Sequence, residues 1–368
     1  MTDELEEPLA LVTDVVGDRA GEWDRGGRLP EEEVRWLGAK GLLCAQIPPE
    51  FGGRGFSSEE NGRLTAHTGR LCSSLRSLMT SQGMAAWTVE RFGSGAQQGR
   101  YLSQLTSGSL TGVAFSEPAA GSDLSAISTR ISAEGDTVLI EGQKVWVTGA
   151  AYADLLVVFG RYGEGAAAAV VPTDAAGVAV RPIPDPLGCR AAGHADVSFD
   201  GVRIPADSLL GGAGLPIEWL VTSALTYGRL SVAWGCVGIL QACLSAAAGH
   251  AAVREQSGRR LVDHQLVARH LAELLVAEQA AVRCCEHASR CWDRGIPMAT
   301  SAVLTKHFAA TNAARGAASA VQVLGSAGAR DGETVARAYR DAKVMEIIEG
   351  SSEISQLLLS EHAVSVWS

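Results

Sequence analysis

A glutamate near the end of the chain stands in surroundings that suit a catalytic base. Glu349 follows two isoleucines and precedes Gly350, Ser351 and Ser352. An apolar environment raises the pKa of a carboxylate towards neutrality, and glycine lets a substrate carbonyl come close to backbone N–H groups. A base and a donor for a developing oxyanion would then be neighbours. The same run also fits an ordinary helix end with Gly350 as its cap, and alone it does not decide between the two.

Polar and aromatic residues of kinds that suit a cofactor gather in two further runs, FSEPAAGSDL at 115–124 and GQKVWVTGA at 142–150. The first run holds Glu117, the chief competitor of Glu349 for the role of base. Its neighbour Pro118 and the Gly-Ser-Asp turn that follows indicate a structural or cofactor-adjacent role instead. Trp146 in the second run, taken by itself, is typical of a half-buried strand aromatic.

Together with residues 340–354, these two runs resemble the acyl-CoA dehydrogenase family. The resemblance continues through YGRLSVA at 227–233, REQSG at 254–258 and VQVLG at 321–325, in the family's order and at its spacings. Six ordered motifs over about 240 residues are hard to reach by chance. The N-terminal third resembles the family by its helical character more than by any signature.

The resemblance implies a reaction in which a base removes the proton alpha to a thioester carbonyl while the beta carbon gives a hydride to flavin. Glu349 matches the family's commonest base position, and its backbone N–H beside Gly350 would hold the thioester oxygen together with a flavin hydroxyl. Some branches carry the base one residue before an arginine that matches Arg229. That residue is Gly228 here, which leaves Glu349 without a rival.

FAD is the cofactor that the resemblance implies. Ser116 and Thr148 match positions that hydrogen-bond the flavin ring, Trp146 matches the aromatic residue that packs on it, and Ser122 matches a pyrophosphate contact. The expected FAD-binding residues are Phe115, Ser116, Ser122, Trp146, Thr148, Arg254, Gln322, Gly325, Ser351 and Glu353. Ser122 and Arg229 are also expected to contact substrate.

Three of these FAD residues imply an oligomer. Arg254, Gln322 and Gly325 match residues that reach the adenosine half of FAD across a subunit interface, so we expect a homodimer or homotetramer. Ser257 stands where the family usually has phenylalanine beside the adenine, and Ser326 and Glu353 also depart from the common residues. Loss of the aromatic contact would weaken FAD binding by ~1–2 kcal/mol if nothing compensates.

The periodicity of apolar residues predicts an α+β protein in three parts. Helical spacing runs from residue 1 to about 110, and period-two alternation from 111 to 212 predicts a small central β-barrel or sandwich. From 213 to 368 the helical period returns and predicts a four-helix bundle. Within the central part, Glu141-Gly142 and Asp200-Gly201 are predicted to be turns between strands.

Two details of the third part concern one predicted helix. Its apolar stripe is expected on a single face, formed by Leu266, Val267, His270, Leu271, Leu274 and Leu275. Further along stand Cys284, Cys285, His287 and Cys291. Their spacing fits no common zinc pattern, so we expect packed thiols on a helix and no metal.

A net charge of −10 argues against a nucleic-acid partner. The first thirty residues are acidic and lack an apolar core, so they are not typical of a signal or transit peptide. The sequence pattern predicts no apolar run of membrane-spanning length. These observations predict a cytoplasmic protein with no membrane association.

Overall similarity favours, within the family, the members that serve hydroxymalonyl or methoxymalonyl extender units of polyketide biosynthesis. The substrate would be a small polar acyl group on acyl carrier protein. The alternatives are a catabolic acyl-CoA dehydrogenase, an oxygen-using flavoenzyme and a non-catalytic flavoprotein of the same fold. Electron transfer flavoprotein, the family's usual oxidant, is expected as a partner.

Overall fold

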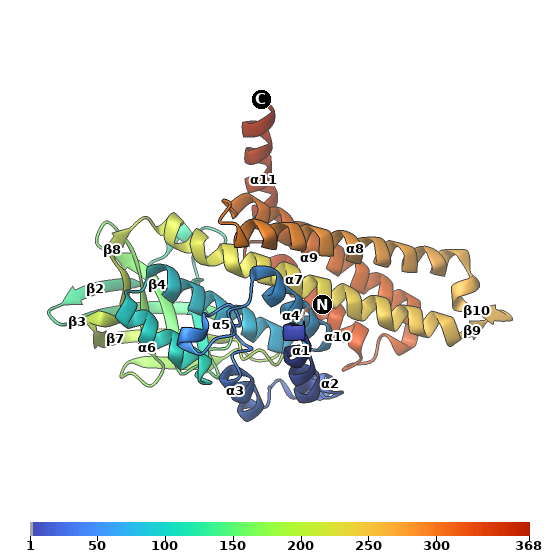
Figure 1. The fold of residues 1–368 in the computed structure, drawn as a ribbon, viewed down its shortest axis with the longest axis horizontal. Helices are drawn as coiled ribbons and strands as arrows, with labels where there is room; N and C mark the ends of the chain where they lie inside the picture. Colours follow the sequence, from blue (N-terminus) through green and yellow to red (C-terminus); the bar gives the residue numbers. More distant parts are fainter. Residues whose placement is uncertain (1–2) are drawn as a thin grey trace.

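The computed structural model describes residues 3–368, and its first third is helical (Figure 1). The helices are α1 (Asp3–Val16), α2 (Ala20–Gly26), α3 (Glu31–Ala39), α4 (Ser58–Leu71), α5 (Ser73–Phe92) and α6 (Gly95–Thr106). Helix α2 ends where Gly27 takes a left-handed φ of 63°, a conformation that glycine adopts without strain. Helix α4 begins with a capping box between Ser57 and Glu60. The helical prediction for this part is confirmed.

An eight-stranded sheet follows the first helices. Its strands are β1 (Thr111–Ala114), β2 (Arg130–Glu134), β3 (Thr137–Val147), β4 (Leu155–Tyr162), β5 (Gly165–Pro172), β6 (Val178–Pro182), β7 (Ala195–Pro205) and β8 (Leu209–Leu215). Seven strands pair in the order β6-β7-β3-β2-β4-β5-β8, and β1 pairs with β4 in parallel. The inward side chains of β2, β3, β4, β5 and β7 form one buried cluster, so the sheet curls around a core of its own.

The outer face of β4 and β5 is buried as well. Val157, Phe159 and Val170 pack there in one cluster with side chains of α5, α6 and the start of α7. A strand buried on both faces reads as a continuous apolar run in the sequence, which explains the run at 155–159. Helix α5 therefore packs against the outer face of the sheet.

The two predicted turns inside the central part are wrong. Glu141-Gly142 lies within β3 and Asp200-Gly201 within β7, and the register between these strands shifts by one residue there. Asp200 and Gly201 oppose Glu141, which is the arrangement of a β-bulge. A β-bulge favours the same small or turn-forming residues as a hairpin turn. The two residue pairs therefore mark an irregularity within paired strands, and not a turn between them.

Four long helices form the C-terminal bundle. They are α7 (Ile217–Val253), α8 (Gln265–Asp293), α9 (Ala299–Leu324) and α10 (Thr334–Ile347), with the short hairpin β9 (Glu255–Gln256) and β10 (Arg259–Arg260) between α7 and α8. A last helix, α11 (Ser352–Trp367), projects away from the rest of the molecule (Figure 1). Alanines of α9 such as Ala309, Ala313 and Ala317 are fully buried against α7, which lets the two helices approach closely.

Helix α8 departs from the predicted stripe. Leu274 is buried and Val267 and Leu271 are half-buried, whereas Leu266 and Leu275 are exposed. The stripe is thus wider than the face of α8 that the rest of the chain covers. Cys285 is buried among apolar residues of the bundle, as expected for a packed thiol, and no group of metal-ligating side chains occurs within residues 3–368.

Helix α7 is long and apolar enough to cross a membrane, so the expectation that no run reaches that length is wrong. However, 78% of its most apolar window is buried inside the protein. Helix α7 is the central helix of the bundle. It packs against α4, α5, α8, α9 and α10.

The α+β fold class, with helices, then a β-region, then a helical bundle, is confirmed. Strand β8 continues to Leu215 and α7 begins at Ile217. The domain boundaries at about residues 110 and 212 stay a prediction.

Candidate active site

Glu349 lies in the short segment between α10 and α11, in an unusual backbone conformation. Its φ is 56°, in the left-handed region, and that of Gly350 is 95°. A glutamate in this region costs about 1–3 kcal/mol and persists only where its surroundings enforce it. Two buried cations do so here: Arg229 Nε donates to Glu349 O at 3.0 Å, and Lys306 Nζ donates to Gly350 O at 2.7 Å.

The carboxylate of Glu349 is buried and incompletely paired. Its Oε2 has no hydrogen-bond partner in the described part of the chain. Burial raises the pKa of Glu349, and the nearby cations Arg229, Lys306 and Arg76 oppose that rise. A dry carboxylate with a raised pKa and a free oxygen is suited to accept a proton near neutral pH.

Gly228 makes room for this carboxylate. A Cβ on Gly228 would lie 2.7 Å from Glu349 Oε2 and 2.7 Å from Met84 Sδ. Any side chain at position 228 would therefore collide with the carboxylate of Glu349. A base at position 228 and a base at position 349 exclude each other in space, which gives a physical reason for glycine at the alternative position.

Lys306 and Arg76 were missed by the sequence reasoning. Both side chains are fully buried, and burial lowers the pKa of Lys306 to about 8. Lys306 had a visible signal, since it is the only lysine of α9, a helix made mostly of alanine and other small or apolar residues. Arg76 had none, because the run around it contains serines and threonines that are typical of an exposed helix face.

Glu117 is buried too, but all its acceptor capacity is used. Lys144 Nζ donates to Oε1 at 2.8 Å and the Thr129 amide at 2.9 Å, while the Ser128 amide and hydroxyl both donate to Oε2 at 2.7 Å. Although burial acts to raise the pKa of Glu117, these hydrogen bonds lower it to about 2. Such a carboxylate stays ionised and is a poor base. Lys144 also donates to Phe115 O at 2.9 Å, so the ion pair anchors the 115–117 segment.

The segment around Trp146 and Thr148 presents a face that fits a flat ring. Trp146 has a φ of 57° in a second bulge, opposite Asp196, whose Oδ1 accepts from the Trp146 amide at 3.2 Å. This conformation directs an indole that is 56% exposed. Thr148 Oγ1 lies 3.2 Å from Nδ1 of His194, whose pKa is lowered to about 4 by burial. His194 was also missed by the sequence reasoning.

Helix α5 brings this face close to the base. Ser81 Oγ donates to Thr148 O at 3.1 Å. Met84, less than one turn further along α5, adjoins the space shared by Gly228 and Glu349. The ring-binding candidates and the candidate base therefore meet at one turn of α5, although about 200 residues separate them in the sequence.

The remaining candidates on this side lie as follows. Phe115 stacks on Phe159 at 4.2 Å between ring centroids, and Ser116 O accepts from the Val145 amide at 2.9 Å. Ser122 is in an exposed glycine-containing loop. These residues, with Trp146 and Thr148, fit the ring and pyrophosphate of FAD, since they offer an open aromatic surface, hydroxyls and a small-residue loop in one region.

Three candidates lie far from this region. Arg254 caps the end of α7, 26 residues beyond Gly228, which corresponds to about 39 Å of helix. Gln322 and Gly325 are at the end of α9, which is parallel to α7 because α8 runs back between them. The structure thus separates Arg254, Gln322 and Gly325 from the other FAD candidates of the same chain.

The last two candidates begin α11. Ser351 is its N-cap and accepts from the Ile354 amide, and Glu353 is exposed in the first turn. Arg229 was expected to contact substrate, and the contact that the structure shows is the one to Glu349 O. Its role towards substrate stays a prediction.

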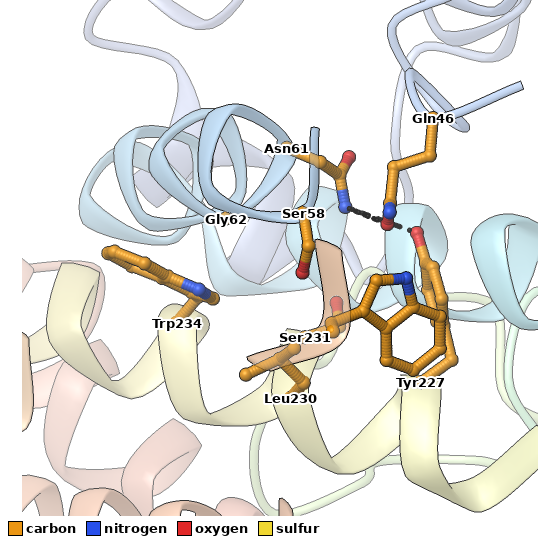
Figure 2. Close-up of a pocket in the computed structure, with 9 residues that line it drawn as sticks. Gln46, Ser58, Asn61, Gly62, Tyr227, Leu230, Ser231 and Trp234 are labelled. Atoms are coloured by element: carbon orange, nitrogen blue, oxygen red, sulfur yellow. Dashed lines mark hydrogen bonds between the residues drawn. The ribbon is translucent and has the colours of Figure 1, made fainter. Parts of the chain in front are cut away.

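Two small polar cavities lie between α4, α5, α7 and α8, and Glu349 lines neither of them. Figure 2 shows the smaller one, where Asn61 Nδ2 donates to both Gln46 Oε1 and Tyr227 Oη, at 3.1 and 3.2 Å. The larger, of about 90 Å³, includes Glu90 and Trp87. Polar lining and this size suit a few water molecules, and the polar groups of the smaller cavity already pair with one another.

Comparison with known proteins identifies the class. Models of the acyl-CoA dehydrogenase N-terminal, middle and C-terminal domains match residues 5–109, 112–202 and 219–364. The human mitochondrial short-chain specific acyl-CoA dehydrogenase is 33% identical over 93% of this chain and 85% of its own length. The chain belongs to the acyl-CoA dehydrogenase family and is an FAD-dependent enzyme that dehydrogenates acyl thioesters.

Solved structures agree with this assignment. FkbI for biosynthesis of the methoxymalonyl extender unit of the FK520 polyketide immunosuppressant is 58% identical, with a TM-score of 0.94, over 97% of this chain and 99% of its own. Butyryl-CoA dehydrogenase from Megasphaera elsdenii is 25% identical, with a TM-score of 0.94, over 99% of both chains.

Proposed function

We propose that this enzyme dehydrogenates a small, polar acyl group carried by acyl carrier protein, in the formation of a hydroxymalonyl or methoxymalonyl extender unit for polyketide biosynthesis. The single observation that carries the proposal is the 58% identity to FkbI along nearly the whole of both chains. Identity to the short-chain acyl-CoA dehydrogenase is much lower, at 33%. The catabolic acyl-CoA dehydrogenase is therefore the second candidate.

In the proposed mechanism Glu349 removes the proton alpha to the thioester carbonyl. Its raised pKa and free Oε2 suit that transfer, and Arg229 and Lys306 keep the carboxylate in place by holding the carbonyls of residues 349 and 350. The Glu349 amide donates to the thioester oxygen as negative charge develops there, and Gly350 leaves space for that approach. FAD, when bound, supplies the acceptor for the hydride.

We further propose how FAD is held. Phe115, Ser116, Trp146 and Thr148 bind the ring portion, Ser122 binds the pyrophosphate, and Ser351 and Glu353 contact the same cofactor from the start of α11. Arg254, Gln322 and Gly325 bind the adenosine half of the cofactor held by a partner subunit. The length of α7 between Gly228 and Arg254 supports this division.

A homodimer or homotetramer follows from this arrangement. Helix α11 supports an oligomer, because within one chain it buries Ser355 and leaves its large apolar side chains exposed. The exposed apolar residues of α11 are Leu357, Leu358, Val364, Val366 and Trp367. An exposed apolar helix of this kind marks an interaction surface. Sedimentation of the holoenzyme should give a mass of two or four chains, and a single-chain mass would contradict the proposal.

Electron transfer flavoprotein is the proposed oxidant and the cytoplasm the proposed location; both rest on family membership. A non-catalytic flavoprotein is disfavoured by Glu349, because a base with these properties has no use without a reaction. An oxygen-using flavoenzyme stays an alternative, which is decided by what reoxidises the reduced flavin. Reduced enzyme that is reoxidised by air faster than by electron transfer flavoprotein would favour the oxygen-using alternative.

The proposed function is tested by mixing the oxidised enzyme anaerobically with thioesters and following the visible absorbance of its flavin. Each acyl group is offered on both CoA and acyl carrier protein. Bleaching by small hydroxylated acyl groups on the carrier, and much slower bleaching by the same groups on CoA, would support the extender-unit function. Faster bleaching by simple acyl-CoA thioesters would contradict this proposal and favour a catabolic acyl-CoA dehydrogenase.

A further inference from the structure

The larger of the two cavities, between α5, α7 and α8, has three aromatic walls. Trp87 of α5, Tyr227 of α7 and Trp292 of α8 all line it. The ring centroid of Trp292 lies 4.6 Å from that of Trp87, at an interplanar angle of 55°, and 6.1 Å from that of Tyr227, at 76°. Rings that meet at such steep angles face in different directions, so they enclose a space instead of stacking into a layer.

Two of these rings are fixed by hydrogen bonds. Trp87 Nε1 donates to Ser223 O at 3.1 Å, and Tyr227 Oη accepts from Asn61 Nδ2 at 3.2 Å (Figure 2). Gly83 makes room for the tyrosine, since a Cβ at position 83 would collide with Tyr227 Oη. The walls of the cavity are thus preorganised, and binding there would cost little side-chain entropy.

A carboxylate adds negative charge to these walls. Glu90 lines the same cavity and follows Trp87 by three residues on α5. It is half-buried, and its carboxylate has no ion pair or hydrogen bond within the described residues 3–368. Burial raises the pKa of Glu90, and no cation of the chain opposes the rise. A positive group in the cavity would supply the missing partner.

The faces of the three rings carry no cation of the chain either. Within residues 3–368, no arginine or lysine lies over Trp87, Tyr227 or Trp292, although such contacts occur at four other rings. An aromatic face has a negative potential that attracts a cation, most strongly for tryptophan. The net charge of −10 adds a favourable field for positive ligands. The cavity therefore offers three ring faces and a carboxylate to a cation.

The other walls decide which kind of cation fits. Cys44, Ile47 and Ala86 are buried and mainly apolar, and Gln46 Oε1 already accepts a hydrogen bond. A hard metal ion needs about six oxygen ligands, which this lining does not supply. A nitrogen that carries methyl groups suits it better, because its charge is spread over an apolar surface and needs no further acceptor. Each water-sized group needs roughly 10–15 Å³, so about 90 Å³ accommodates a nitrogen with its methyl groups.

We propose that this cavity binds a compact methylated ammonium cation, held by the faces of Trp87, Tyr227 and Trp292 and by the carboxylate of Glu90. The site is separate from the candidate active site, because Glu349 does not line the cavity. Gly228, which adjoins Glu349, is turned by about 100° around α7 from its neighbour Tyr227. The inference therefore goes beyond thioester dehydrogenation and does not depend on it.

The first test uses the wild-type holoenzyme and needs no variant. Calorimetry compares choline with 3,3-dimethylbutan-1-ol, which has the same shape but a carbon in place of the charged nitrogen. Choline should bind about 10- to 100-fold more tightly, as expected for a cation on desolvated rings. Exchange of sodium chloride for potassium chloride should leave its affinity unchanged. Absence of choline binding, equal affinities for the two compounds, or competition by potassium would each overturn the proposal.

Variants then locate the binding. Glu90→Gln keeps the shape of the side chain but removes its charge, so choline should bind about 3- to 10-fold more weakly while the neutral alcohol is unaffected. Trp87→Leu removes one ring face and should weaken choline binding about 5- to 30-fold. The control is Glu50→Gln, since Glu50 is exposed and outside the cavity although it is close to Ile47 in the sequence.

Glu50→Gln should bind choline as wild type does. If Trp87→Leu does not fold, Glu90→Gln decides alone, because it changes neither the size of the side chain nor the aromatic walls. Equal choline affinities of wild type and Glu90→Gln, or an equal loss in Glu50→Gln, would overturn the site.

Discussion

Glu117 and Glu349 both have carboxylate oxygens that are shielded from solvent, but their hydrogen-bond partners differ in a way that suits them to different roles. Glu117 accepts from Lys144, from the Ser128 amide and hydroxyl, and from the Thr129 amide, and its pKa falls to about 2. Glu349 keeps Oε2 unpaired, and its pKa is raised. In both cases cations are close. At Glu117 the cation binds the carboxylate, whereas Arg229 and Lys306 bind main-chain carbonyls beside Glu349 and leave its side chain free.

The comparison teaches that burial alone does not make a base. A buried carboxylate that is fully hydrogen-bonded is stabilised in its charged form and organises its neighbours. A buried carboxylate with an unpaired oxygen lowers the stability of the folded protein but accepts a proton more readily. Such groups are common at functional sites. Sequence distance, burial and charge would not have separated these two residues, but the count of donors to each oxygen does.

The largest expected effect is that of Glu349→Gln. Since glutamine cannot accept the alpha proton, the rate of flavin reduction by thioester should fall by about 10²–10⁴-fold, the usual contribution of a general base. FAD content should stay that of wild type. Stopped-flow absorbance under anaerobic conditions measures both. An unchanged rate would place the base elsewhere and remove the contrast with Glu117.

The matched change Glu117→Gln should act on stability instead. It leaves the Lys144 ammonium buried without its anion, which costs about 3–5 kcal/mol in the free energy of unfolding. Denaturant titration of the holoenzyme measures this loss. The fraction that remains folded should still reduce flavin at a rate near that of wild type. A rate loss as large as that of Glu349→Gln, at full stability, would contradict the structural role of Glu117.

A smaller effect is expected from Gly228→Ala. The added methyl would meet Glu349 Oε2 and Met84 Sδ at 2.7 Å, so the carboxylate must move and the reduction rate should fall about 10- to 100-fold. Gly249→Ala is the control, because it is in the same helix and its Cβ would meet nothing within 4 Å. That variant should keep its activity and gain up to about 1 kcal/mol in stability. Equal rates for the two variants would show that Glu349 is not confined by Gly228.

The smallest effect concerns pH. Because the folded pKa of Glu349 is raised above 4.5, its burial does not destabilise the protein below pH 4.5, and the destabilisation grows as pH rises towards the folded pKa. Glu349→Gln should therefore have a higher melting temperature than wild type at neutral pH, and the difference should vanish in acid. The lowered pKa of Glu117 has the opposite sign: its contribution is present above pH 4.5 and is lost as pH falls towards 2. Melting temperatures of both variants across pH test these signs, and a parallel pH dependence would contradict them.

The order of helices, strands and helices was readable from the sequence because burial imposes periods of 3.6 and 2 on apolar residues. Glu349, with its apolar neighbours and glycine, was also readable. The bulges at Gly201 and Trp146 were not, because a residue with positive φ signals either a turn or a bulge, and only the paired strand decides. Arg76, Lys306 and His194 were not readable as a group either. Their relation to Glu349 and Thr148 exists only once α5, α7, α9 and the sheet have packed.

The exposed apolar residues of α8 and α11 mark another limit of sequence patterns. Leu266 and Leu275 extend the stripe of α8 beyond the face that one subunit covers. Periodicity reports an apolar face whether or not a single chain covers it, so it does not distinguish a core from an exposed surface. The same stripe that predicts a helix therefore overestimates how much of it is buried in a single chain.

The fixed backbone of the segment that carries the candidate base has a consequence for evolution. Arg229 and Lys306 grip the carbonyls of residues 349 and 350, and neither contact uses the side chain at 349. A single codon change there would deliver a different functional group to the same point in space, on a backbone already fixed to receive it. The backbone of this segment can therefore be inherited unchanged while the residue at position 349, and with it the reaction, differs between related enzymes.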